Sequence, residues 1–244
     1  MQVWRVDATY AVCGPLKPHR RGHHPPARCG RDEAGLDGHR TISKGLGGMD
    51  TTWLYAINRL ARATGWAHPI VLGYADFGVA LFAAFLVVGW WMARRRGSAQ
   101  QMAAVWCAGL AVLAAVAINQ PLVALAARPR PYTAHPDLLI LAHRSTDWSF
   151  PSDHATMAGA AAAGLWFVSR RLGQITAVAA LFMAFSRVYI GAHYPGDVLA
   201  GLAVGAATAI IVYALAHRRL TRLAALIART RLRPLVAGRL AVAG

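Results

Sequence analysis

One uncharged stretch constrains this chain more than any other feature. Residues 97–127 contain no Asp, Glu, Lys or Arg. A helix needs about 20 apolar residues to cross the hydrocarbon core of a bilayer. The whole chain is also apolar, with a mean hydropathy of +0.37 and only 15% charged residues. The chain is thus more apolar, and carries fewer charged residues, than ordinary soluble domains, so the sequence predicts a membrane protein.

Four further apolar runs extend this prediction to an all-α, polytopic membrane helical bundle. The five predicted transmembrane helices cover residues 69–92, 98–126, 152–168, 172–189 and 195–216. The third and fourth are short for a bilayer-spanning helix. We therefore expect their polar ends to lie at the membrane surface, where charged side chains can meet water or a ligand.

The N-terminal part differs from the rest. Residues 1–48 are rich in Pro, Gly, His and Arg and have no periodic apolar pattern, which predicts a disordered tail; a mis-called start, with Met49 as the true one, is an equal alternative. Residues 49–65 carry apolar side chains at helical spacing and fit a helix in the membrane interface. A sixth span that includes residues 52–65 is the alternative. The expected domains are thus 1–48, a membrane domain at 49–216, and a basic cytoplasmic segment at 217–244.

The distribution of charge indicates orientation rather than a nucleic-acid partner. The net charge is +16, but the arginines form short clusters between uncharged runs, as expected of loops. The clusters at residues 94–96, 170–171 and 218–219 fall on one side of a five-span bundle, and the positive-inside rule makes that side cytoplasmic. Residues 128–150 and 191–194 then face outward. Five spans would also place the basic N-terminal tail outside, which favours a later start or a sixth span.

Three polar clusters gather on this outer face. The first, Arg128-Pro129-Arg130-Pro131-Tyr132, follows the second predicted span. It fits a proline-stiffened loop whose arginines reach the interface. The alternative is an anion clamp, because a guanidinium group can bind two phosphate oxygens at once.

The second cluster, Ser149-Phe150-Pro151-Ser152-Asp153-His154, opens the third span. Ser152 fits an ordinary helix N-cap. The free amides of a helix N-terminus, including that of Asp153, can also bind phosphate. A histidine at the start of a membrane helix is costly unless it has a partner or a task, so His154 favours a functional site.

The third cluster places Arg187, His193 and Asp197 around the turn between the fourth and fifth spans. A carboxylate bonded to one imidazole nitrogen leaves the other free and basic, as a nucleophilic histidine requires. A polar helix cap is the alternative, but it does not explain Arg187. A metal site is disfavoured because the nearby arginines would repel a divalent cation, and the three cysteines lack the spacing of a zinc site or a disulfide framework. We expect neither a metal nor another cofactor.

Together the clusters resemble the type 2 phosphatidic acid phosphatase family, whose signature is K-x6-R-P, P-S-G-H and S-R-x5-H-x3-D. The third motif matches fully at Ser186, Arg187, His193 and Asp197. In the second motif Asp153 replaces Gly, which is similar to the undecaprenyl-diphosphate phosphatase branch. In the first motif Arg128-Pro129 is present, but Pro121 stands where the signature has Lys, and Arg130 is the candidate substitute. The resemblance covers residues 49–216.

The resemblance implies a covalent mechanism that needs no metal. His193 would attack the terminal phosphorus and form a phosphohistidine, while Asp197 orients its ring. His154 would protonate the leaving group and then activate water. The phosphate oxygens would be held by Arg128, Arg187, Ser152 and the amide of Asp153, with Arg130 as a further contact.

The leading functional hypothesis is a polyprenyl-diphosphate phosphatase that regenerates a monophosphate lipid carrier for cell-wall synthesis. It would lie in the bacterial plasma membrane with its site on the extracytoplasmic face, and its partners would be a lipid phosphate and the bilayer. One alternative is a phosphatase for phosphatidic acid, phosphatidylglycerol phosphate or another prenyl phosphate. Another is a non-catalytic protein that binds anionic lipid. The oligomeric state does not follow from the sequence.

Overall fold

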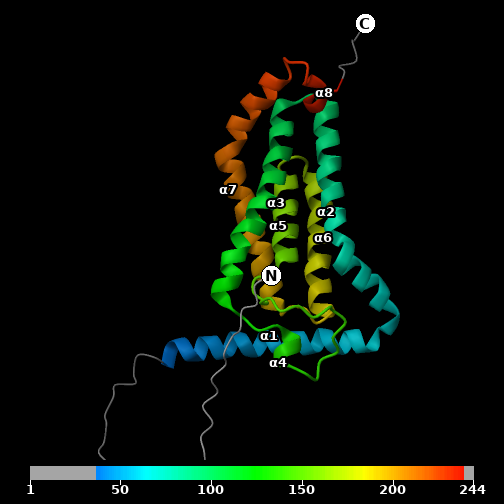
Figure 1. Ribbon diagram of the computed structural model, residues 1–244, viewed down its shortest axis with the longest axis vertical. Coiled ribbons are helices and arrows are strands. Elements are labelled where there is room, and N and C mark those ends of the chain that lie inside the picture. The colour runs from blue at the N-terminus through cyan, green and yellow to red at the C-terminus, as the bar shows by residue number, and fades with distance from the viewer. Residues whose placement is uncertain (1–36, 239–244) are drawn as a thin grey trace, which may run out of the picture. The chain divides into compact units, whose positions relative to one another are not determined.

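The computed structural model describes residues 37–238, and all regular structure in that range is helical (Figure 1). Predictions about residues 1–36 lie outside the described residues, as does the end of the basic C-terminal segment. The chain divides into two units, residues 1–40 and residues 41–244. The elements in chain order are α1 Asp37–Ala63, η1 Gly65–Ala67, α2 His68–Arg96, α3 Ala99–Ala126, α4 Pro131–Ala134, α5 Asp153–Trp166, α6 Arg170–Tyr189, α7 Pro195–Ile227 and α8 Arg233–Val236.

The five predicted membrane helices correspond to α2, α3, α5, α6 and α7, which confirms the helical bundle. Four segments of the described chain are long and apolar enough to cross a bilayer: Gly65–Arg96, Ala99–Ala134, Arg170–Tyr189 and Pro195–Ile227. The exception is α5, whose 14 residues extend only about 21 Å. It packs against α3, α6 and α7, and most of its side chains are buried.

The part of α1 that belongs to the second unit lies crosswise at one end of the bundle (Figure 1). On this helix, Trp53 and Leu60 are exposed while Leu54 is fully buried, as expected of an interfacial helix with one apolar face on the protein. α1 is not among the candidate spans, so the alternative of a sixth span is not supported.

The other end of the bundle carries the arginine clusters. The predicted boundary at residue 217 falls inside α7, which continues to Ile227. The chain then folds back, and Arg94 Nε donates a hydrogen bond of 2.5 Å to the carbonyl oxygen of Pro234. The basic segment thus begins as an extension of the last membrane helix.

Close packing between α5 and α7 places two of the polar clusters together. A Cβ atom at Gly205 would lie 2.0 Å from the carbonyl oxygen of Thr156, and one at Gly159 would lie 2.5 Å from that of Leu202. Small residues allow membrane helices to approach this closely. The start of α5 is consequently held against the start of α7, and the amide of Ser152 donates to the carbonyl oxygen of Asp197 at 3.1 Å.

We expect Gly205→Ala to destabilise the protein, because the added methyl group would force α5 and α7 apart. Overpacking of this kind costs about 1–3 kcal/mol or more. Gly109→Ala in α3 is the matched control, since, apart from the adjoining backbone of α3 itself, no atom lies within 4 Å of the position that its methyl group would take. Thermal unfolding of both variants in the same detergent measures the effect. Equal midpoints for the two variants would contradict the close approach.

Candidate active site

The three polar clusters meet in a pocket of about 320 Å³ beside α5 and α6. Its lining combines cationic, imidazole and carboxylate side chains from five parts of the described chain: Asp76, Arg130, Asp147, Asp153, His154, Arg187 and His193. The structure thereby brings together both predicted histidines and two of the three predicted arginines.

His193 is buried at the inner wall of this pocket, with 2% of its surface exposed. Its Nδ1 lies 2.8 Å from the carbonyl oxygen of Ser149. A carbonyl oxygen can only accept, so Nδ1 carries the proton in the neutral ring. The unprotonated Nε2 faces Arg130, whose Nη1 lies 3.2 Å away. The ring therefore presents its basic nitrogen to the pocket.

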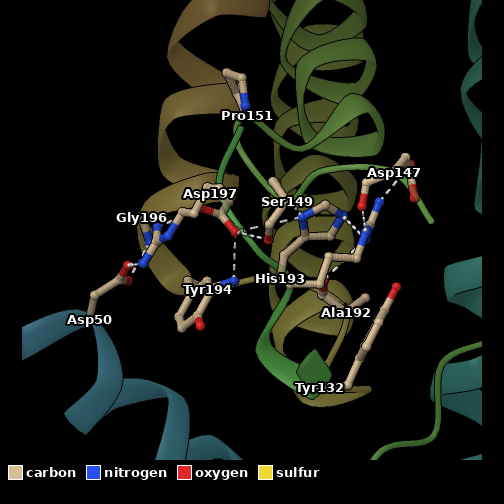
Figure 2. A network of polar contacts seen from close by, with 12 residues as sticks. Asp50, Tyr132, Asp147, Ser149, Pro151, Ala192, His193, Tyr194, Gly196 and Asp197 are labelled. Carbon is tan, nitrogen blue, oxygen red and sulfur yellow. Dashed lines mark hydrogen bonds and ion pairs between the residues drawn. The ribbon is translucent and has the colours of Figure 1, made fainter. Parts of the chain in front are cut away.

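Asp197 supports His193 in a way that the sequence did not predict. Its Oδ2 is 3.8 Å from His193 Nδ1, too far for a hydrogen bond. Instead, Oδ2 accepts hydrogen bonds from the Ser149 hydroxyl group and from the Tyr194 amide (Figure 2). The expected direct orientation of the ring by Asp197 is thus replaced by an indirect one, in which Asp197 holds Ser149 and the Ser149 carbonyl holds the ring.

The surroundings favour the neutral form of His193. Burial lowers the pKa of His193 below the ordinary histidine value; Asp197 opposes this effect, while the positive charges of Arg187 and Arg130 add to it. A neutral imidazole with Nδ1 protonated has a lone pair on Nε2. This is the protonation state that nucleophilic attack requires.

Of the two arginines of the first cluster, Arg130 lines the pocket and Arg128 does not. Arg130 is buried in the pocket, where it donates to the Ala192 carbonyl oxygen at 3.1 Å and pairs with Asp147 at 2.8 Å. Arg128 does not line this pocket; it pairs at 2.6 Å with both Asp50 and Asp197.

A repeat in the sequence explains why Arg130 rather than Arg128 lines the pocket. The chain reads Arg-Pro-Arg-Pro at residues 128–131, so the family signature fits equally well with Arg130-Pro131 as its final pair. The position of the signature lysine is then Val123 instead of Pro121. The repeat was the available signal, and the path of the chain after α3 decides between its two readings.

Arg187 is the second cation of the pocket. Its Nη1 lies 3.5 Å from the Ala75 carbonyl oxygen, and its buried Nε has no hydrogen-bond partner among the described residues. Leaving such a donor unpaired costs about 1–3 kcal/mol. An anion in the pocket would supply the missing acceptor.

The second cluster is only partly in the pocket. His154 lines it, as predicted, whereas Ser152 does not. Ser152 is fully buried at the N-cap of α5, and its hydroxyl oxygen has no partner among the described residues. The Ser152 side chain, which the sequence predicted as a phosphate ligand, is therefore not part of the pocket wall, although the next residue, Asp153, is.

Asp153 is held by two side-chain amides of α3. Its Oδ1 accepts hydrogen bonds from Asn119 Nδ2 at 2.6 Å and from Gln120 Nε2 at 3.1 Å. Asn119 is fully buried and also accepts a bond from Thr156. Sequence reasoning missed this network, although an Asn-Gln pair inside the long uncharged run was a visible signal. Asp76 and Asp147 were missed as well, because no motif contains them.

The described residues include no group of three or more His, Cys, Asp or Glu side chains arranged to hold a metal ion. The pocket combines two guanidinium groups and two imidazoles with three carboxylates. This set of groups can bind a phosphate and exchange protons with it.

Comparison with known proteins agrees with this chemistry. Residues 104–221 match the PAP2 superfamily. The undecaprenyl-diphosphatase BcrC of Bacillus subtilis is 32% identical over 149 residues, which cover 61% of this chain and 75% of the relative. The chain belongs to the PAP2 superfamily. It is therefore a bacterial membrane protein and a hydrolase that acts on lipid phosphate, and the alternative of a non-catalytic lipid binder is not supported.

Other relatives act on different lipids. The decaprenylphosphoryl-5-phosphoribose phosphatase of Mycobacterium tuberculosis is 38% identical over 106 residues, or 43% of this chain and 57% of the relative. Among solved structures, a PAP2-type phosphatidylglycerolphosphate phosphatase from Bacillus subtilis is similar with a TM-score of 0.50 and 25% identity, covering 69% of this chain and 86% of that one. The family fold is thus shared by enzymes with different substrates.

We expect Arg130→Gln to lower kcat by about 10²- to 10³-fold, because it removes a preorganised charge from the pocket. Arg144→Gln is the control: Arg144 is exposed and its guanidinium group lies 5.9 Å from the Tyr132 ring, outside the pocket lining. Phosphate release from a lipid phosphate measures both. An active Arg130→Gln enzyme would show that this side chain does not contact the substrate.

Proposed function

We propose that the protein hydrolyses undecaprenyl diphosphate, or a related polyprenyl diphosphate, to the monophosphate through a phosphohistidine on His193. The observation that carries this proposal is the arrangement of His193, whose Nδ1 bonds to the Ser149 carbonyl oxygen at 2.8 Å while Nε2 faces the pocket beside Arg130. The similarity to undecaprenyl-diphosphatase BcrC supports the choice of lipid.

In the first step, His193 Nε2 attacks the terminal phosphorus. The N–P bond forms as the bond from phosphorus to the bridging oxygen breaks, and the lipid monophosphate leaves. His154, on the same pocket, donates a proton to the leaving oxygen. Arg130 and Arg187 bind the oxygens of the transferring group, where negative charge accumulates in the transition state.

In the second step, His154 accepts a proton from water, and the resulting hydroxide attacks the phosphohistidine. The N–P bond breaks, inorganic phosphate leaves and neutral His193 is restored. Asp197 contributes through Ser149, whose carbonyl oxygen stabilises the protonated Nδ1 throughout. In this arrangement Arg128 contributes indirectly, since both of its terminal nitrogens pair with carboxylates.

A second candidate substrate is a phospholipid monoester such as phosphatidic acid or phosphatidylglycerol phosphate. The phosphatidylglycerolphosphate phosphatase that shares the fold favours it. Asp153 favours the diphosphate instead: the similar undecaprenyl-diphosphate phosphatase branch also has Asp at this position, and the network of Asn119 and Gln120 keeps its carboxylate in the pocket wall.

Phosphate release by the purified protein in detergent with EDTA tests the reaction. We expect release from undecaprenyl diphosphate well above that from phosphatidic acid, and loss of essentially all turnover in His193→Ala. Substrate labelled with ³²P in the terminal phosphate should leave acid-labile, alkali-stable label on the wild-type protein after a rapid quench. Substantial turnover by His193→Ala would contradict the phosphohistidine mechanism. Phosphate release from phosphatidic acid alone would show that the substrate is a phospholipid monoester and not the diphosphate.

We further propose that the pocket faces the outside of the cell, where recycling of the lipid carrier for cell-wall synthesis would take place. The arginines at residues 94–96 and 170–171 lie toward the end of the bundle opposite to α1 (Figure 1). By the positive-inside rule, these arginines favour an orientation in which that end faces the cytoplasm. In a variant without its native cysteines, an impermeant maleimide added to intact cells should label His135→Cys and not Arg95→Cys. The reverse pattern would overturn the orientation.

A further inference from the structure

A polar network joins the interfacial helix α1 to the support of His193 (Figure 2). We propose that Asp50 and Arg128 are positioning residues, which hold Asp197 in place and adjust the charge that it presents to His193. This inference rests on the proposed role of His193 as the nucleophile.

The network begins on α1. Asp50 Oδ2 pairs with Arg128 Nη2 at 2.6 Å, and Asp50 Oδ1 accepts a hydrogen bond of 2.7 Å from the Gly196 amide. Gly196 lies in the first turn of α7, where backbone amides lack intrahelical partners. Asp50 thus accepts a hydrogen bond from an amide of α7 that has no partner within the helix. Its negative charge also interacts favourably with the positive end of the α7 dipole.

Arg128 carries the connection further. Its Nη1 pairs with Asp197 Oδ1 at 2.6 Å, and its guanidinium group lies 3.8 Å from the centre of the Tyr194 ring. Asp197 is fully buried, and a buried carboxylate is costly without a cation or several hydrogen bonds. Arg128 is its one ion-pair partner within the described residues other than the distant His193 contact.

The last steps reach the nucleophile. Asp197 accepts a hydrogen bond from the Ser149 hydroxyl group. The carbonyl oxygen of Ser149 in turn accepts a hydrogen bond from His193 Nδ1. The network therefore runs from α1 through the loop after α3 and the start of α7 to the loop before α5. None of these contacts uses a residue that we place on the substrate, apart from His193 itself.

The two positioning residues act on His193 in opposite electrostatic directions. Arg128 offsets the negative charge of Asp197, and Asp50 offsets the positive charge of Arg128. Without Arg128, Asp197 would stabilise protonated His193 more strongly, so the pKa of His193 would rise. Without the Asp50 charge, Arg128 would offset Asp197 more fully, and the pKa of His193 would fall. The charged and titratable groups around His193 are Asp197 from α7, Arg187 from α6, Arg130 before α4 and His154 from α5.

The experiment compares kcat, KM and the pH profile of kcat/KM for wild type, Asp50→Asn and Arg128→Gln. We expect kcat to fall about tenfold or more in both variants, with KM changed less than about threefold, because the network does not touch the substrate. His193 must be neutral to attack, so the acidic limb of kcat/KM should move to higher pH in Arg128→Gln and to lower pH in Asp50→Asn.

Asp137→Asn is the matched control. Asp137 accepts a hydrogen bond of 3.0 Å from Tyr55 on α1, so it attaches the same helix without entering the network. Wild-type kcat is expected for this control. An equal loss of kcat in Asp137→Asn and Asp50→Asn would mean that α1 merely needs to be attached, and it would overturn the proposal, as would shifts of the two acidic limbs in the same direction.

Arg128→Lys provides a second test if Arg128→Gln does not fold. Lysine keeps the charge but cannot reach two carboxylates with a planar fork. For Arg128→Lys we expect a kcat between those of wild type and Arg128→Gln, and an acidic limb of kcat/KM close to that of wild type. A wild-type kcat in Arg128→Lys would overturn the positioning role. Failure of the proposed function is recognised separately, because wild-type protein would then release phosphate without forming labelled phosphohistidine.

Discussion

The buried carboxylate of Asp197 is the interaction on which the rest of the site depends. It receives hydrogen bonds from the Tyr194 amide and the Ser149 hydroxyl group, and an ion pair from Arg128. These donors come from the turn before α7, the loop before α5 and the loop after α3. A carboxylate without them would be strongly destabilising in this environment, so the three segments are held together by one group.

Helix packing makes that arrangement possible. The glycines of α5 and α7 allow the two backbones to meet, with a Cβ at Gly205 only 2.0 Å from the Thr156 carbonyl oxygen. The short α5 then starts inside the bundle beside the turn that carries His193. Neighbouring helices cover its buried face, which lets a helix too short to span a bilayer form part of a membrane domain.

The pocket is organised for an anion before one is bound. Arg187 presents a buried Nε without a partner among the described residues, and Arg130 is fixed by Asp147 beside the basic nitrogen of His193. Fixed charges of this kind need not reorganise as the phosphoryl group transfers. Asp76, Asp147 and Asp153 place three carboxylates in the lining beside these two guanidinium groups.

The sequence by itself determined the membrane class, the five helices of the bundle, and the placement of His154, Arg187 and His193 at one face, because hydropathy and motif spacing are local properties of the chain. Only the tertiary structure decided which arginine enters the pocket, since Arg128 and Arg130 are separated by one proline and face different sides of the same loop. It also decided that Asp197 acts through Ser149, and that Asn119 and Gln120 hold Asp153. These contacts join residues more than 30 positions apart, and their geometry depends on how closely the helices pack.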